Sequence, residues 1–426
     1  MKSGRRGFLK SGATLAGGLT LGRVAPAIGQ TQGIGQTPGS GQTPGPEKFI
    51  KAGKELIAYG ERSRFVTSVR MGHPPGGRPS PDEFGLSFHI STPLQDQMGV
   101  ITPSSLHHVA TTRGSFIPDI DPREHRLMIH GMVDRPLVFT IEDLMRLPSV
   151  TRLHFIECAG NRSMPGAKTV QETHGLSSCA EWTGVLLSVL LKEAGVKGGA
   201  PWILAEGNEE VKGTSSIPMA KAMDDCFVAY GMNGEPVRPQ QGFPLRLMVP
   251  GFEGIFHTKY LRRIKVVDQY YTNYNEYGHL RKDPKDAALG YQIGPKSVIT
   301  FPSGGQQLAG RGFYEIRGLA WSGGGAIRKV EVSTDGGRNW KTAEIRGTAA
   351  RMAHTKFTYT WNWDGTETEL LSRCTDEIGQ VQPTRAQVAK FFNAPADHHS
   401  FNVPGNDNSI QPWRVARDGS VHNAIA

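Results

Sequence analysis

The chain has 426 residues, of which 38% are hydrophobic, and it contains 53 glycines and 28 prolines. This length allows two or three domains, and the glycine and proline content argues against a helical bundle and for a globular protein rich in loops and strands. The net charge is +9 at pH 7, but five of the basic residues lie in an N-terminal leader. The mild basic excess that is left suits an anionic substrate, and without a dense basic cluster it argues against nucleic acid as a partner.

The first 27 residues have the pattern of an export signal. Arg5 and Arg6 open the run RRGFLK, which is the core of a twin-arginine signal, and a weakly apolar stretch follows at 11–21. Small residues at 25–27 fit a cleavage site, and the apolar stretch is too short to span a bilayer comfortably. The twin-arginine route carries folded proteins, often with a cofactor already inserted, so we expect the bacterial periplasm as the mature location.

Residues 28–46 are mostly Gly, Gln, Thr, Ser and Pro, and the pentapeptide GQTPG occurs twice among them. Such a composition cannot bury a core, and it predicts a disordered linker behind the cleavage site. The next segment, 47–120, is rich in proline, glycine and polar residues, and we expect it to wrap the surface.

Short strands and short helices are mixed between residues 125 and 251. The apolar patterns predict strands at 126–131, 137–139 and 243–251, the last of them buried. Helices are predicted at 140–145, 182–191 and 216–222. Thr140 is the expected N-cap of the first helix because Asp143 follows three residues later, and Gly195 is expected to end the second. Because the order lacks a regular βαβ rhythm, it favours an α+β fold.

One cysteine stands at the end of a predicted buried strand. Apolar residues within 153–156 lead to Cys158. Gly160 and Asn161 then tolerate the positive φ of a sharp turn. Arg162 would lower the pKa of the thiol and favour the thiolate, which is the form that attacks or binds metal. A buried structural cysteine is the competing interpretation.

The other three cysteines are expected mainly in hydrophobic cores; they are Cys179, Cys226 and Cys374. No pattern supports a disulfide among them, and if Cys158 is a metal ligand, at least one of them stays unpaired. The sequence has no CxxC motif and therefore no CxxCH site for covalent haem.

From about residue 295 short strands are separated by turns. The strands are predicted at 314–317, 329–333 and 357–361, and Asp335-Gly336-Gly337 is a hairpin signal. This pattern predicts an immunoglobulin-like β-sandwich over 295–426. We expect Trp340, Trp361 and Trp363 to be mostly core residues of this sandwich.

The run 155–162, FIECAGNR, resembles the cysteine loop of the sulfite oxidase family of molybdenum enzymes, in which the cysteine sulfur ligates the metal. The likeness extends from 102 to 382 and includes segments in the family's order at 181–185, 233–236, 241–246, 249–251 and 259–261. It implies an α+β molybdopterin-binding catalytic domain over 47–294 and a dimerisation domain over 295–426, with the latter forming a homodimer.

The resemblance also assigns cofactor contacts. It implies that Cys158 is the metal ligand and that the molybdopterin is held by Asn161, Arg162, His174, Gln241, Arg246 and Lys259. An arginine in a buried strand independently favours an anionic partner for Arg246. For His174, a satisfied structural histidine is the competing interpretation. Gln241 stands where many members have histidine, and Ser163 stands where a second arginine often follows the cysteine loop.

For the substrate, the resemblance implies an arginine and a tyrosine. Arg113 takes the arginine's place if one gap is allowed, whereas a gapless alignment puts Thr112 there and leaves Arg113 as a surface charge. A guanidinium can hold two oxygens of a sulfur oxyanion at once. Tyr277 is the preferred tyrosine over Tyr271 and Tyr274, and the alternative is an aromatic loop that only packs at the domain boundary.

Within the family, several segments resemble the molybdenum subunits of sulfane dehydrogenases; they lie at 111–114, 118–122, 171–179 and 296–300. We therefore expect a molybdenum oxidoreductase that oxidises a reduced sulfur species by oxygen-atom transfer, acting on sulfane bound to a sulfur-carrier protein or on sulfite. Because no haem motif is present, the electrons would pass to a c-type cytochrome subunit. The alternatives are a free-sulfite dehydrogenase, a sulfoxide reductase, and a scaffold subunit without cofactor.

Overall fold

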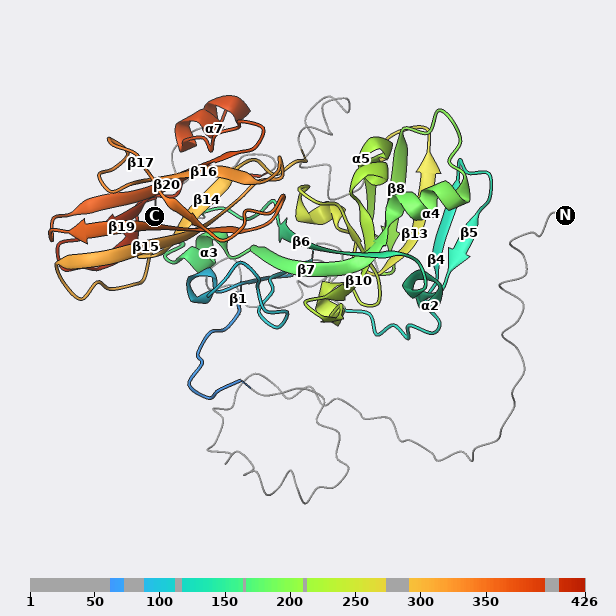
Figure 1. The fold of residues 1–426 in the computed structure, drawn as a ribbon, viewed down its shortest axis with the longest axis horizontal. Coiled ribbons are helices and arrows are strands. Elements are labelled where there is room, and N and C mark those ends of the chain that lie inside the picture. The colour runs from blue at the N-terminus through green and yellow to red at the C-terminus, as the bar shows by residue number, and fades with distance from the viewer. Residues whose placement is uncertain are drawn as a thin grey trace, which may run out of the picture. The chain divides into compact units, whose positions relative to one another are not determined.

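The computed structural model describes residues 62–72, 88–111, 117–163, 166–209, 213–272, 291–394 and 406–425 (Figure 1). The chain divides into two compact units, Met1–Val66 and Thr67–Ala426. In the described end of the first unit, the amide of Val66 donates to the carbonyl of Ser63. The predicted signal and linker lie outside the described residues, and the domain boundaries stay predictions. Across the described ranges, no helix has the length and apolar character to cross a bilayer.

Three sheets form the first part of the larger unit. A small antiparallel sheet joins β1 (Met71–Gly72), β2 (Phe88–Ser91) and β3 (Val109–Thr111). A second has the order β11 (Glu235–Pro236), β10 (Phe227–Met232), β7 (Ser177–Leu186) and β6 (Ser149–Glu157), with β12 (Arg246–Met248) also paired to β10. The third has the order β5 (Leu137–Phe139), β4 (Leu127–Gly131), β13 (Leu261–Val267), β8 (Trp202–Gly207) and β9 (Thr214–Pro218).

Short helices connect these strands. The α-helices are α2 (Ile141–Met145), α3 (Val170–His174), α4 (Leu187–Ala194) and α5 (Met219–Asp224), and the 3-10 turns are η2 (Leu94–Asp96), η3 (Pro239–Gln241) and η4 (Gly254–Phe256). The predicted capping box at the start of α2 is confirmed, because the amide of Asp143 donates to the hydroxyl of Thr140 and the carboxylate of Asp143 accepts from the amide of Thr140. Gly195 ends α4 in the left-handed conformation, as predicted.

The prediction of a helix over 182–191 is wrong in its first half. Residues up to Leu186 belong to β7, and only the segment from Leu187 is helical. A run of apolar and β-branched residues fits either structure, and here the pairing of β7 with β6 and β10 decides. Gly184 permits the close pairing with β10, since a Cβ there would lie 2.0 Å from the carbonyl oxygen of Val228.

Three smaller expectations also differ from the structure. The segment 216–222 first completes β9 and becomes helical only at Met219. The buried strand predicted at 243–251 is confined to β12. Within 88–111, residues 91–94 and 107–109 are buried rather than wrapped over the surface, because their backbone and side chains bond to β7 and to the end of α3.

Two antiparallel sheets form the second part and confirm the predicted β-sandwich. One has the order β14 (Lys296–Phe301), β15 (Gly312–Trp321), β19 (Thr355–Trp363) and β18 (Glu344–Arg346). The other has the order β17 (Lys341–Thr342), β16 (Ile327–Ser333), β20 (Thr368–Asp376), β21 (Trp413–Val415) and β22 (Val421–Asn423), and α7 (Arg385–Phe392) lies beside it. The hairpin signal is confirmed after β16, where Gly336 and Gly337 both have positive φ.

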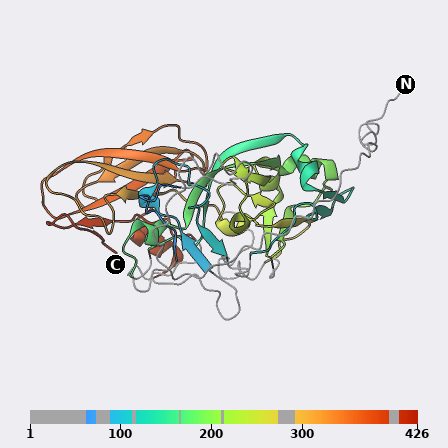
Figure 2. The same ribbon diagram turned by 90° about the horizontal axis from the view of Figure 1, so that it is seen from below.

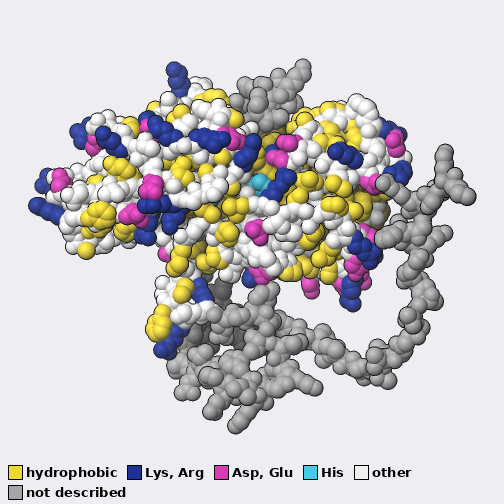
Figure 3. Space-filling model, in the orientation of Figure 1, with side chains coloured by type: hydrophobic (Ala, Val, Ile, Leu, Met, Phe, Trp, Pro, Cys, Tyr) yellow, Lys and Arg dark blue, Asp and Glu magenta, His cyan; other side chains and the backbone are white. Residues whose placement is uncertain are grey.

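The two parts of the larger unit share a hydrophobic core. Figures 1 and 2 show the sandwich strands at one end and β4, β5, β8 and β13 at the other, with β6 and β7 running between them. Phe155 of β6 and Cys179 of β7 belong to the same buried cluster as Trp321 and Phe357 of the sandwich. On the face that Figure 3 shows, basic side chains lie dispersed with acidic ones among them, in line with the mild basic excess.

Candidate functional site

The cysteine loop is held by backbone hydrogen bonds on both sides of Cys158. The amide of Cys158 donates to the carbonyl of Leu176 over 3.0 Å, and its carbonyl accepts from the amide of Asn161 over 2.9 Å. The predicted positive φ is wrong, since neither Gly160 nor Asn161 has the left-handed conformation and the hydrogen bond to Asn161 closes the turn instead. Cys158 is half-buried, whereas the other three cysteines are buried, and none of the four is in a disulfide.

The electrostatics of the thiol differ from the expectation. Burial raises the pKa of Cys158 to about 11, and nearby Glu253 and Glu157 raise it as well, while a backbone hydrogen bond with Gly160 and the charge of Arg162 lower it without reversing the shift. The prediction that Arg162 makes a thiolate is therefore wrong for the metal-free protein, because burial outweighs one neighbouring charge. A bound metal ion would deprotonate the thiol outright.

Asn161 is fully buried and ties the loop to its surroundings. Its side-chain nitrogen donates to Glu157 over 2.8 Å, and its side-chain oxygen accepts from the amide of Leu176 over 2.9 Å. Both ends of this side-chain amide are therefore occupied by protein groups next to Cys158. One is the Glu157 carboxylate, and the other is the backbone of Leu176, whose carbonyl accepts from the amide of Cys158. A direct contact of Asn161 with a cofactor stays a prediction, as does that of Arg162.

A second group of predicted residues surrounds β12. Arg246 is 3% exposed, and its Nη1 donates to the backbone and side-chain oxygens of Gln241 over 3.0 and 3.1 Å. The guanidinium lies 5.4 Å from the ring of Trp182, and its Nε is buried with no hydrogen-bond partner in the described part of the chain. Burial lowers the pKa of Arg246 to about 9, so it stays charged at neutral pH. No carboxylate of the described residues forms an ion pair with it.

Two buried histidines that the sequence did not single out contact this group through Gln241. His107 and His108 are buried with stacked rings 5.0 Å apart, and the carbonyl of His108 accepts from Gln241 over 2.8 Å. Burial lowers the pKa of His107 to about 3, and Arg246 and Lys259 contribute, so the ring is neutral. Lys259 donates to the carbonyl of Ala110 over 3.2 Å. The sequence signal for these histidines is that they are adjacent and stand next to an apolar residue. Adjacent histidines do not have the spacing of metal ligands, so the pattern predicts no metal site.

The remaining predicted residues are placed less completely. His174 is buried at the end of α3, its Nδ1 lies 2.9 Å from the hydroxyl of Thr173, and burial lowers its pKa well below the usual value. Arg113 and Tyr277 lie outside the described residues, as do the alternatives Thr112 and Tyr274. Tyr271 is described, and its backbone exchanges two hydrogen bonds with the hydroxyl of Ser216.

Glu253 is a buried carboxyl that the sequence did not single out. It is 1% exposed, and within the described residues its oxygens have only a weak contact with the backbone of Asn406, too poor in geometry for a full hydrogen bond. Burial raises its pKa to about 8, and the negative charge of Glu157 adds to the effect. It lies near the cysteine loop, since a Cβ on the neighbouring Gly254 would lie 3.0 Å from the carbonyl oxygen of Glu157.

Replacing Glu253 by glutamine is expected to remove a loss of stability that the apoprotein shows between about pH 5 and about pH 8. The carboxyl holds its proton more tightly when folded, so its stabilising effect is complete below its unfolded pKa of 4.5 and is lost as the pH rises through about 8. At about 1.4 kcal/mol per pKa unit, the wild type should lose about 2–4 kcal/mol more than the variant. Urea denaturation at the two pH values measures this difference.

Glu331→Gln is the matched control for this experiment. Burial raises the pKa of Glu331, but hydrogen bonds to Lys329 and Arg373 lower it by more, so its net shift is downward. The control should therefore leave the change between the two pH values unaltered. An equal change in the wild type and in Glu253→Gln would contradict the prediction.

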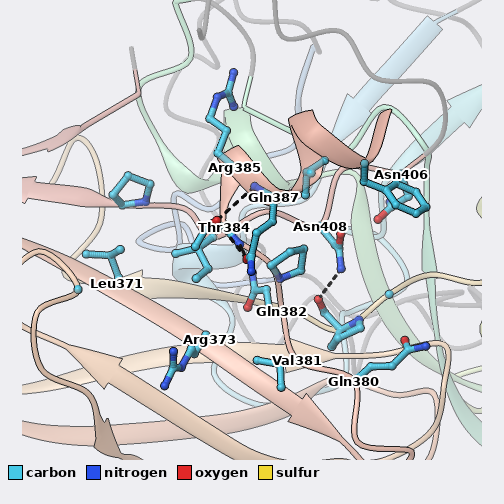
Figure 4. Close-up of a pocket in the computed structure, with 18 of the residues that line it drawn as sticks. Leu371, Arg373, Gln380, Val381, Gln382, Thr384, Arg385, Gln387, Asn406 and Asn408 are labelled. Atoms are coloured by element: carbon cyan, nitrogen blue, oxygen red, sulfur yellow. Dashed lines mark hydrogen bonds between the residues drawn. The ribbon is translucent and has the colours of Figure 1, made fainter. Parts of the chain in front are cut away.

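The described residues also line a cavity of about 960 Å³ in the second part (Figure 4). Figure 4 shows Thr384 and Gln387 of the α7 end on one side and Arg373, Gln380 and Val381 on the other, while the side chain of Arg385 points away from them. Its lining contains none of the predicted site residues. Within the described ranges, no group of three or more His, Cys, Asp or Glu side chains is placed to hold a metal ion.

Comparison with known proteins adds two matching family models. An oxidoreductase molybdopterin binding domain matches residues 114–275, and a Mo-co oxidoreductase dimerisation domain matches residues 288–393. Mitochondrial sulfite oxidase of Mus musculus is 34% identical over 341 residues, which are 69% of this chain and 59% of that protein. Nitrate reductase [NADH] 1 of Arabidopsis thaliana is 33% identical over 351 residues, 70% of this chain and 38% of that protein. The chain thus spans less than two thirds of either relative.

A solved structure matches most of the chain. The crystal structure of the sulfane dehydrogenase SoxCD from Paracoccus pantotrophus contains a chain that is 38% identical, with a TM-score of 0.78. The match covers 87% of this chain and 95% of that chain.

Proposed function

The chain belongs to the sulfite oxidase family of molybdopterin oxidoreductases, and on this premise we propose that it oxidises a reduced sulfur species and passes the electrons to a c-type cytochrome subunit. The cofactor of the family is molybdopterin with molybdenum. The likeness to sulfane dehydrogenase supports sulfane bound to a carrier protein as the substrate, with sulfite as the second candidate. The absence of a CxxCH motif from the 426 residues supports a separate cytochrome.

The described residues fit a cofactor with an anionic phosphate. The observation that carries the proposal is Arg246, a buried positive charge with a buried Nε that has no partner and no carboxylate in the described part of the chain. A buried charge is costly unless it is paired, so this position calls for an anion. Arg246, Lys259 and Gln241 would hold the pterin and its phosphate, and Cys158 would ligate the molybdenum.

When bound, the molybdenum cofactor supplies oxygen-atom transfer and two-electron redox chemistry. The chain's own residues hold the cofactor and orient the metal ligand. Backbone bonds fix the turn that presents Cys158, and His107 and His108 stay neutral and leave the positive charge to Arg246 and Lys259. We propose that Arg113 stabilises charge on the substrate oxygens and that Tyr277 lies at the same site.

The location and assembly are part of the proposal. The twin-arginine pattern at Arg5 and Arg6 supports the periplasm. The matched dimerisation domain supports a homodimer through the second part of the chain. Neither feature bears on the choice between sulfane and sulfite.

Comparative turnover tests the proposal. Purified protein is assayed with cytochrome c as acceptor, using sulfite in one series and a sulfane bound to a carrier thiol in the other. Faster turnover of the carried sulfane is expected, whereas faster turnover of sulfite would favour a free-sulfite dehydrogenase. Full activity of protein purified without any associated haem would contradict the cytochrome subunit. Absence of stoichiometric molybdenum would favour the scaffold alternative.

A further inference from the structure

A buried lysine of the β-sandwich reaches the cysteine loop of the first part. Lys296 is the first residue of β14, and its side chain and that of Glu157 are both 0% exposed. The Nζ of Lys296 donates to Oε1 of Glu157 over 2.5 Å and to the carbonyl of Asn161 over 2.8 Å. Glu157 immediately precedes Cys158, and Asn161 follows it by three residues. One ammonium group therefore bridges both ends of the turn that carries Cys158.

The sandwich contributes a second donor beside the first. Trp321 lies directly opposite Lys296 in the pairing of β14 with β15, and its Nε1 donates to Oε2 of Glu157 over 2.6 Å. Asn161 donates to Oε1 of the same carboxylate over 2.8 Å. Both oxygens of Glu157 are thus held, one by the loop and Lys296 and the other by Trp321.

This pair is better explained by positioning than by stability alone. A buried ion pair often contributes little net stability, because removing both charges from water costs about as much as their attraction returns. Apolar residues at both positions would link the two parts at least as well. The charges instead act on the two residues that flank Cys158, and short charge-assisted hydrogen bonds fix direction as well as distance.

We propose that Lys296 is a positioning residue for the metal site, which holds the Cys158 turn through Glu157 and Asn161 and so couples the β-sandwich to the molybdenum centre. The inference rests on the proposed function, because it takes Cys158 as the ligand. Without the bonds from Lys296, Cys158 would still ligate the metal, but the turn that carries it could rotate.

The test uses the full-length holoenzyme with both charges removed together, in the variant Glu157→Gln/Lys296→Met, so that no charge is left buried alone. The readouts are molybdenum content, the Mo(V) electron paramagnetic resonance spectrum, and kcat and KM measured separately. We expect molybdenum to be retained, the spectrum to shift, and kcat to fall by about tenfold to a hundredfold with KM changed much less, as when a group that orients a metal ligand is lost.

Two further variants separate positioning from folding. Ser297→Ala is the matched control, since Ser297 follows Lys296 on β14 and its hydroxyl bonds, among the described residues, to Ser372 and Gln382 of the sandwich. It should lower the unfolding temperature without altering the spectrum. Lys296→Arg keeps the charge, but a planar guanidinium cannot hold Glu157 and Asn161 in the same geometry as one ammonium nitrogen, so it should fold with a shifted spectrum and a lowered kcat.

Each outcome decides the question. A folded double variant with wild-type spectrum and kcat would overturn the inference, and so would a Ser297→Ala variant with the same spectral shift. If the double variant fails to fold while Lys296→Arg folds with an unchanged spectrum and unchanged kcat, the pair is structural only and the inference also fails. Wild-type protein that lacks molybdenum would instead contradict the proposed function itself.

Discussion

Replacing Cys158 by serine is expected to give a folded protein whose turnover falls by more than about 100-fold, since loss of groups that merely orient a ligand costs about 10- to 100-fold. The fold should survive because backbone groups, not the thiol, hold the turn: the amide donates to Leu176 and the carbonyl accepts from Asn161. A serine hydroxyl fills a similar volume but does not replace a thiolate as a ligand. Steady-state turnover and thermal unfolding, measured on the same preparation, check both parts.

Cys374→Ser is the control for this variant. Cys374 is 1% exposed and lies in β20 of the sandwich, away from the loop. The Cys374→Ser substitution should lower the stability of the fold, because a hydroxyl is costlier to bury than a thiol. It should not change turnover per molybdenum. A Cys158→Ser enzyme that keeps more than about a tenth of wild-type turnover would contradict the assigned role of the thiolate.

Replacing Arg246 by methionine is expected to have opposite effects on the two forms of the protein. The apoprotein should become more stable by about 1–3 kcal/mol, because a buried charge without a carboxylate partner is replaced by an apolar side chain of similar length. The holoenzyme should lose its cofactor about tenfold to a hundredfold faster, since a charge-assisted hydrogen bond to the anion is gone. Urea denaturation of the apoprotein and pterin release from the holoenzyme measure the two effects.

Arg317→Met provides the comparison for Arg246. Arg317 also lies over an aromatic ring, 4.7 Å from the centre of Phe301, but it is exposed on β15. It should change neither the stability of the apoprotein by more than about 0.5 kcal/mol nor the rate of pterin release. An Arg246→Met apoprotein that is less stable than the wild type would show that this arginine is already satisfied by protein groups.

Local signals in the sequence predicted much of the fold. The strands of the sandwich follow from local patterns. Apolar residues alternate around β15, β16 and β19, and a glycine pair marks the turn at 336–337. Thr140 and Asp143 mark the start of α2 by chemistry within four residues. The helix prediction for 182–191 was wrong in its first half because a short apolar run is compatible with both a strand and a helix. The strand partners that decide between them lie far away in the sequence.

The site was predictable only where the family's motifs covered it. The string around Cys158 and the arginine in β12 carry their chemistry in the sequence itself. The contact between Glu157 and Lys296 does not, because the two lie 139 positions apart and nothing in either segment specifies the other. Glu253 and the pair His107 and His108 were missed for the same reason, since burial and neighbours from distant strands decide their charge.

The role of Cys158 as metal ligand is tested by X-ray absorption at the molybdenum edge, comparing the purified wild type with Cys158→Ser. If the Cys158 sulfur binds molybdenum, the variant must show fewer sulfur neighbours around the metal than the wild type, with the pterin still present. Identical sulfur coordination in the two proteins, or a wild type without molybdenum, would contradict the claim that this thiolate anchors the metal.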